Sequence, residues 1–129
     1  MSRAASSLAL CAALALSACG EMPGRPQGLM DVAERPAERA LLTGLRAYDD
    51  GQYPQAEQQL QQALQLGLAS AKDRAAAHKH LAFIFCTSNR VLDCEAQFRA
   101  AKRVDPDFAL SKSEAGHPLW GPVYQRVQR

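Results

Sequence analysis

The stretch GLRAYDDGQYPQAEQQLQQALQLG, residues 44–67, decides the fold. Apolar and small residues recur with a helical period up to Tyr48, and this pattern begins near Pro36, a residue suited to the first turn of a helix. The polar sequence DDGQ at 49–52 then interrupts the period. A second helix is expected from about Pro54 to Leu66, with Ala56, Leu60, Ala63 and Leu64 on one face and glutamines on the other. The stretch therefore predicts a helical hairpin.

The same arrangement occurs again further along the chain. The first unit has Gly44, Gly51, Tyr53, Ala56, Leu60 and Ala63, and the second has Ala82, Asn89, Val91, Cys94, Phe98 and Ala101 at the matching positions. This order of small, turn-forming and bulky residues resembles the tetratricopeptide repeat. The offset from Gly44 to Ala82 exceeds the usual unit of ~34 residues, so we expect extra length around Ser70 to Arg74.

The resemblance covers about residues 36–108 and implies stacked helical hairpins, in which small residues let two helices approach closely and bulky ones fill the space between hairpins. Ala40 and Thr43 depart from the large residues that the repeat has at their positions. The outer packing of the first hairpin is therefore expected to differ from that of a standard repeat.

The C-terminal tail is expected to cover one open end of the repeats, because repeat arrays need caps. Ser111 and Glu114 have the spacing of a capping box, and Pro118 can open a last helix. One stripe of that helix would hold Trp120, Val123, Tyr124 and Val127. We therefore predict an all-α domain over residues 36–129, made of two tetratricopeptide-like hairpins and a C-terminal capping helix.

Residues 1–18 have the layout of a bacterial secretory signal: Arg3, then an Ala/Leu-rich run that is too short for a comfortable membrane span. An uncleaved anchor is the alternative. The sequence LSAC at 16–19 resembles the lipobox of bacterial lipoproteins, which implies a covalent lipid on Cys19 as the only bound group. Cys11 would leave with the signal peptide.

Residues 19–35 would form the lipidated N-terminus and a flexible tether, since GEMPGRPQG at 20–28 is rich in Gly and Pro. A flexible segment of this length has a reach of roughly 20–24 Å. Two or more acyl chains hold a protein on a bilayer, whereas one chain binds marginally. Gly20 stands where lipoproteins retained at the inner membrane tend to have Asp, which favours the outer membrane, with the domain facing the periplasm.

Composition excludes some classes of partner. Removal of residues 1–18 lowers the basic count from 15 to 14, against 13 acidic residues. A nearly neutral chain without a basic run is not expected to bind nucleic acid.

Cys86 and Cys94 lie on either side of the second turn, nearly symmetric about Arg90. Antiparallel helices bring such positions together, and an oxidising periplasm favours a disulfide. Two alternatives stay open: a pair of small buried residues, or a metal or thiol site, for which this spacing supplies only two ligands.

No constellation of catalytic residues is present, so we expect neither an enzyme nor a small-molecule substrate. His78 and His80 are two positions apart and cannot easily share a metal ion. His117 has no accompanying nucleophile or phosphate-binding loop, and is expected to support the cap. No metal or other cofactor is expected.

The tetratricopeptide resemblance implies a concave groove lined by the first helix of each hairpin, where peptides dock. The alternative is that its residues pack against the N-terminal segment or the cap. The groove residues are Leu41, Leu45, Tyr48, Lys79 and Phe83.

The chain is thus expected to be a periplasm-facing lipoprotein scaffold or assembly accessory that binds an envelope protein. Its layout, with the tail EAGHPLWGPVY at 114–124 after the turn DPDF, is similar to the TssQ family of lipoproteins associated with type VI secretion. The alternatives are a pilotin-like lipoprotein for a secretin or pilus component, and a structural envelope protein.

Lipidation gives the first testable prediction. The wild-type chain should incorporate labelled palmitate and partition into detergent, and Cys19→Ser should do neither, because the thioether and the new N-terminus both require this cysteine. Equal labelling of the two proteins would contradict the prediction.

Overall fold

The computed structural model describes Gly28 and residues 35–129. The predicted signal peptide, the lipidation site Cys19 and most of the tether lie outside these residues. The described part is all-α, and no strand occurs in it. Its helices are α2 (Pro36–Asp49), α3 (Tyr53–Leu66), α4 (Ala71–Thr87), α5 (Val91–Val104), α6 (Lys112–Ala115) and α7 (Gly121–Val127).

Helices α2 and α3 form the predicted first hairpin because small residues lie where their axes meet. A Cβ added to Gly44 would lie 2.9 Å from Cγ of Leu60, a residue with no exposed surface. The turn depends on Gly51, whose φ of +73° is strained for residues with a Cβ. The first helical residue of α3 is Tyr53, one earlier than expected, and Pro54 lies in the first turn, where a missing N–H costs little.

Helices α4 and α5 repeat this hairpin residue by residue. Asn89 takes the place of Gly51 with φ 59°, and Asn tolerates this conformation better than most residues. The backbone N–H of Gln52 donates to the carbonyl of Ala47 at 2.8 Å, and at the matching positions of the second hairpin Arg90 donates to Phe85 at 2.8 Å. The internal repeat in the sequence is therefore a repeat in the structure.

The additional residues between the two hairpins lie at the start of α4. This helix has 17 residues, against 14 in each of α2, α3 and α5. The side chain of Ser70 caps α4 by accepting from the N–H of Asp73 at 3.2 Å. The guanidinium of Arg74 donates to the carbonyls of Leu68 and Ala69, at 2.7 and 3.0 Å. The linker is thus held against the helix that follows it.

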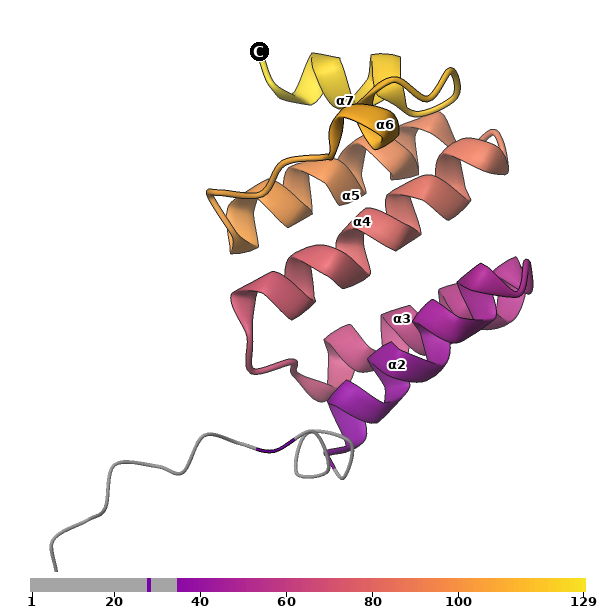
Figure 1. Ribbon diagram of the computed structural model, residues 1–129, viewed down its shortest axis with the longest axis vertical. Coiled ribbons are helices and arrows are strands. Elements are labelled where there is room, and N and C mark those ends of the chain that lie inside the picture. Colours follow the sequence, from indigo (N-terminus) through magenta and orange to yellow (C-terminus); the bar gives the residue numbers. More distant parts are fainter. Residues whose placement is uncertain (1–27, 29–34) are drawn as a thin grey trace, which may run out of the picture.

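The two hairpins stack into layers, with α4 packed on α3 and α2, and the C-terminal segment lies on the opposite side of the second hairpin (Figure 1). The core runs through both hairpins into this segment. Its largest fully buried side chains are Phe98, Leu60, Leu81, Ile84 and Cys94.

The C-terminal segment begins with a complete capping box. The hydroxyl of Ser111 accepts from the N–H of Glu114 at 3.2 Å, and the Glu114 carboxylate accepts from the N–H of Ser111 at 2.9 Å. The phenol oxygen of Tyr124 accepts from the N–H of Leu110 at 3.2 Å, which fixes the segment before α6 against α7.

The last helix begins at Gly121, three positions later than Pro118, so the predicted start is wrong. Residues 118–120 form a turn, in which the N–H of Gly121 donates to the carbonyl of His117 at 2.8 Å. A Cβ on Gly121 would collide with the carbonyl oxygen of Ala115. The expected stripe is nevertheless present: Trp120, Val123 and Tyr124 are buried and Val127 packs beside them.

Trp120→Ala should lower the free energy of unfolding by about 3–5 kcal/mol, because the indole is only 9% exposed and stacks on Phe83. Leu119→Ala is the matched control: this neighbour is 53% exposed and should change stability by less than about 0.5 kcal/mol. Denaturant unfolding measures both, and equal losses would show that the tail is not a cap.

Candidate protein-interaction surface

The predicted groove is partly filled by the chain itself. Phe83 is only 3% exposed, because the ring of Trp120 stacks on it with centroids 4.2 Å apart and planes at 23°. Leu41 is 5% exposed. Both are core residues and neither is accessible as a groove residue, and the cover of Phe83 by Trp120 fits the alternative in which groove residues pack against the cap. The stripe pattern predicts Trp120 in the cap, but does not identify Phe83 of α4 as the residue on which it stacks.

Lys79 is also engaged by the C-terminal segment. Its ammonium lies 2.7 Å from a carboxylate oxygen of Glu114 and 5.8 Å from the Phe83 ring centroid. Burial acts to raise the pKa of Glu114, but hydrogen bonds from Lys79 and from the Ser111 backbone outweigh it and lower that pKa below its ordinary value. Glu114 is therefore a carboxylate at neutral pH, and a partner of Lys79 must displace it or bind beside it.

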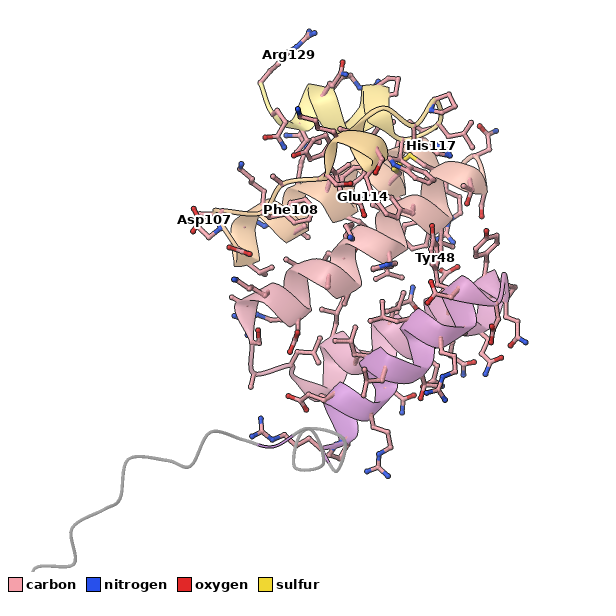
Figure 2. The ribbon with its side chains drawn as sticks, viewed as in Figure 1. Tyr48, Asp107, Phe108, Glu114, His117 and Arg129 are labelled. Carbon is pink, nitrogen blue, oxygen red and sulfur yellow. A yellow bond between two sulfur atoms is a disulfide. The ribbon has the colours of Figure 1, made fainter. Side chains whose placement is uncertain are left out.

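An aromatic surface lies near the α2–α3 turn. We define it as Leu45, Tyr48, Tyr53 and His80. The Tyr48 ring lies 5.5 Å from Tyr53 and 5.0 Å from His80, centroid to centroid. Tyr53 is 40% exposed, and the other three residues are half-buried. In Figure 2, Tyr48 points to the same side of the molecule as His117.

Tyr48 and His80 are neutral members of this aromatic surface at pH 7. Burial lowers the pKa of His80, and its Nδ1–H donates to the carbonyl of Ala76 at 2.8 Å, which fixes the ring. Burial also raises the pKa of Tyr48. The surface therefore offers apolar ring area with a hydroxyl and an imidazole nitrogen at its edges.

Sequence reasoning did not place Tyr53 and His80 at the groove. The repeat pattern accounts for Tyr53 without a groove, and the sequence identifies His80 only as a residue that cannot easily share a metal ion with His78. The period of α4 did contain a signal: His80 lies three positions before Phe83, so the two rings share a face, and their centroids are 5.9 Å apart.

The remaining histidines have structural contacts. His78 shares a 2.7 Å hydrogen bond with Gln97 of α5, on a different side of α4 from His80. His117 stacks flat on Trp120, with centroids 3.4 Å apart, as expected of a residue that supports the cap. Residues 35–129 contain no group of three or more His, Cys, Asp or Glu side chains that could hold a metal ion.

Cys86 and Cys94 form a disulfide between α4 and α5, with Cα atoms 5.2 Å apart. Their counterparts at the matching positions of the first hairpin are Tyr48 and Ala56. Tyr48 of the aromatic surface therefore occupies, in the first hairpin, the position that the disulfide-bonded Cys86 occupies in the second. The bridge lies near Arg90, whose guanidinium covers the Phe85 ring at 4.0 Å and pairs with Glu57 of α3 at 2.9 Å.

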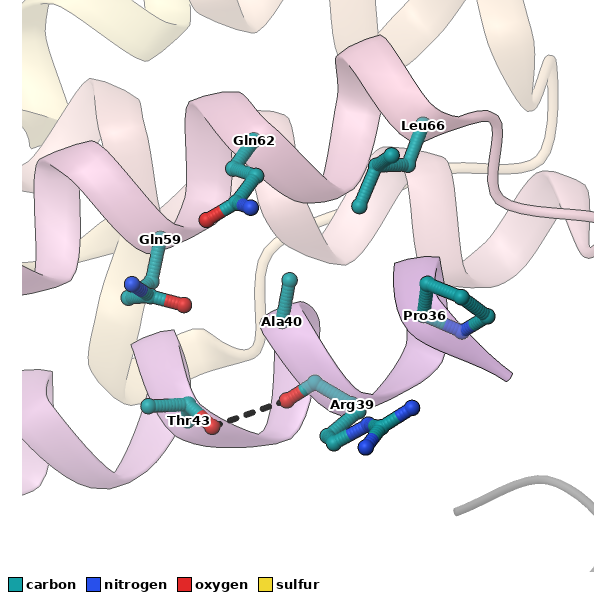
Figure 3. Close-up of a pocket in the computed structure, with 7 residues that line it drawn as sticks. All are labelled: Pro36, Arg39, Ala40, Thr43, Gln59, Gln62 and Leu66. Atoms are coloured by element: carbon teal, nitrogen blue, oxygen red, sulfur yellow. Dashed lines mark hydrogen bonds between the residues drawn. The ribbon is translucent and has the colours of Figure 1, made fainter. Parts of the chain in front are cut away.

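The outer face of the first hairpin closes the array at its other end. A cavity of about 260 Å³ lies there, lined by Pro36, Arg39, Ala40, Thr43, Gln59, Gln62 and Leu66 (Figure 3). The hydroxyl of Thr43 donates to the carbonyl of Arg39 at 2.9 Å. The counterparts of Arg39 and Thr43 in the second hairpin, Ala77 and Leu81, are buried. Polar residues thus replace apolar ones where no further hairpin packs, and the small Ala40 and Thr43 leave the cavity.

Searches against protein-family models, curated proteins and solved structures find no match. Within the described part of the chain, no helix combines the length and the apolar character needed to cross a membrane.

The disulfide gives a stability prediction. Reduction should destabilise the wild-type domain by about 2–3 kcal/mol, the loop-closure value for so short a loop, and lower its melting temperature. A Cys86→Ala/Cys94→Ala double variant is the control, because its melting temperature should not respond to reductant. Two titratable thiols in protein that was unfolded without reduction would contradict the bridge.

Proposed function

We propose that this protein is a lipid-anchored helical scaffold that binds a protein partner in the bacterial envelope, and that the partner belongs to a type VI secretion system. Lipid on Cys19 would hold the chain on the outer membrane, and the tether would let residues 36–129 stand off the bilayer in the periplasm. Neither catalysis nor a cofactor is part of the proposal.

The aromatic surface is the observation that carries this proposal. Tyr48, Tyr53 and His80 come from three helices whose relative positions are fixed by the stacked hairpins, so their rings are largely ordered before a partner arrives. Tyrosine has few rotatable bonds, loses little entropy on binding and is frequent at interface hot spots. A partner segment with an apolar side chain could therefore cover these rings at a small ordering cost.

Lys79 and Glu114 border this surface and add polarity to it. Their 2.7 Å ion pair is partly exposed, with 22% and 28% of the side-chain surfaces accessible. Exposed pairs contribute only ~0–1 kcal/mol. An acidic group of a partner could therefore replace Glu114 at Lys79 without a large loss, provided that Trp120 stays stacked.

Tyr53→Ala should weaken capture of type VI components from detergent-solubilised envelope by about tenfold, or about 1.4 kcal/mol. The melting temperature should stay within a few degrees, because the ring is 40% exposed. Tyr48→Ala should act in the same direction, with some loss of stability from its buried part.

Val91→Ala is the matched control for Tyr53→Ala. Val91 occupies the position of Tyr53 in the second hairpin and is 39% exposed, yet it lies outside the aromatic surface. Its replacement should leave capture unchanged. Equal losses for the two variants would contradict the aromatic surface.

The identity of the captured proteins separates the alternatives. Recovery of a secretin or pilus component in place of type VI components would support the pilotin-like lipoprotein. A structural envelope protein would leave secretion unaffected when the protein is absent. Either result would leave the lipid anchor and the fold as they are.

A further inference from the structure

A second surface concentrates positive charge at the other end of the second hairpin. A cavity of about 280 Å³ is lined by Arg99, Lys102, Arg103 and Val127. We call these residues the basic pocket. The three cations follow one another at i, i+3 and i+4 on α5 and thus share a helix face, and Val127 reaches the pocket from α7.

The charges of the basic pocket are only partly balanced. Arg99 pairs with Glu95, and Glu95 is also shared with Arg126 of α7 at 3.7 Å. The hydrogen bond from Arg99 is the main cause of the lowered pKa of Glu95. Lys102 donates to a neutral partner, the Gln128 side-chain oxygen, at 3.4 Å. Among residues 35–129, no acidic side chain lines the cavity.

The field of Arg103 extends to the neighbouring helix. Burial is the main cause of the lowered pKa of His78 on α4, and the positive charge of Arg103 lowers it further. Like charges three and four positions apart also repel one another along a helix. An external anion in the pocket would relieve this repulsion.

Helix electrostatics alone explains part of the cluster. Lys102 and Arg103 lie in the last turn of α5, where cations interact favourably with the helix dipole. That effect fades within the last turn. It accounts neither for Arg99, one turn earlier, nor for the apolar Val127 of α7, which lines the pocket beside the cations.

We propose that the basic pocket binds an acidic segment of a protein partner, with a Glu or Asp carboxylate between the cations and its methylene groups against Val127. Arginine and lysine form charge-assisted hydrogen bonds with carboxylates. This surface is separate from the aromatic surface, because Arg103 lies at the last turn of α5, whereas Tyr48 and Tyr53 lie at the opposite, turn-bearing end of the hairpins.

A protein segment fits the position of the pocket better than a membrane does. Helix α2 lies on one side of the hairpin stack, whereas α7 lies on the opposite side, next to α5 (Figure 1). A lipid anchor on Cys19 would attach to the domain before α2, so the pocket lies on the side of the domain opposite its point of attachment. This step rests on the proposed lipid anchor at Cys19, and the choice of partner rests on the proposed scaffold function.

The test uses the full chain with Cys19→Ser, so that no lipid contributes to binding. Fluorescence anisotropy measures its affinity for a dye-labelled hexaglutamate peptide, with hexaglutamine as the neutral control. Arg103→Gln should weaken hexaglutamate binding about fivefold, the upper end for one exposed ion pair. Arg46→Gln removes the same charge from an exposed position on α2 and should change the affinity less than twofold.

The dependence of binding on salt and the binding to lipid vesicles are the remaining measurements. Binding should weaken as the Debye length falls from about 10 Å at 0.1 M salt to about 3 Å at 1 M. Equal losses in Arg103→Gln and Arg46→Gln, or equal affinity for hexaglutamine, would overturn the pocket. Binding to phosphatidylglycerol vesicles that depends on Arg103, without hexaglutamate binding, would overturn the peptide in favour of a membrane surface. None of these outcomes depends on lipidation or on Tyr53, so the pocket and the proposed function can fail separately.

Discussion

The stacking of Trp120 on Phe83 is the contact on which the rest of the structure depends. Two helical hairpins bury one face against each other and leave an apolar face at each end of the stack. The indole covers the Phe83 ring of α4 at 4.2 Å, and its Nε1–H donates to the carbonyl of Glu114 at 2.8 Å. One side chain thus closes the core and holds helix α6, which carries the Glu114 partner of Lys79.

The opposite end is finished by a different means. There the chain replaces apolar residues with Arg39 and Thr43, so α2 can face water without a further layer. A small array can therefore end by adding a covering segment or by changing surface chemistry. This chain does the first at its C-terminal end and the second at α2.

The part of this structure that could be predicted from sequence is the part set by local periodicity. The hairpins, the matching turns at Gly51 and Asn89, and the closeness of Cys86 to Cys94 follow from helical spacing and a repeat.

The path of the C-terminal tail could not be predicted, because Lys79 and Glu114 are far apart in the sequence and no local pattern encodes their contact. For the same reason the sequence leaves two alternatives open for Phe83, a groove or contact with the cap, because its neighbours in sequence do not reveal what covers it. In the folded chain Phe83 is buried. Tyr48 instead contacts the rings of Tyr53 and His80, two residues that the sequence did not place at the groove. The period of a helix shows which residues share a face, but not whether that face is already occupied.

Two small surfaces at opposite ends of the hairpins also suit a tethered protein better than a freely diffusing one. A few aromatic contacts or one carboxylate in a basic pocket would each bind weakly, since exposed ion pairs contribute only ~0–1 kcal/mol. When two weak contacts are linked in one domain, the second forms at an effective concentration that reaches millimolar for short linkers. A lipid anchor on Cys19 would add to this by confining the domain to the membrane on which its partners assemble. The proposed scaffold therefore requires no deep site, only a rigid spacing between modest ones, and the stack of Trp120 on Phe83 helps to keep that spacing fixed.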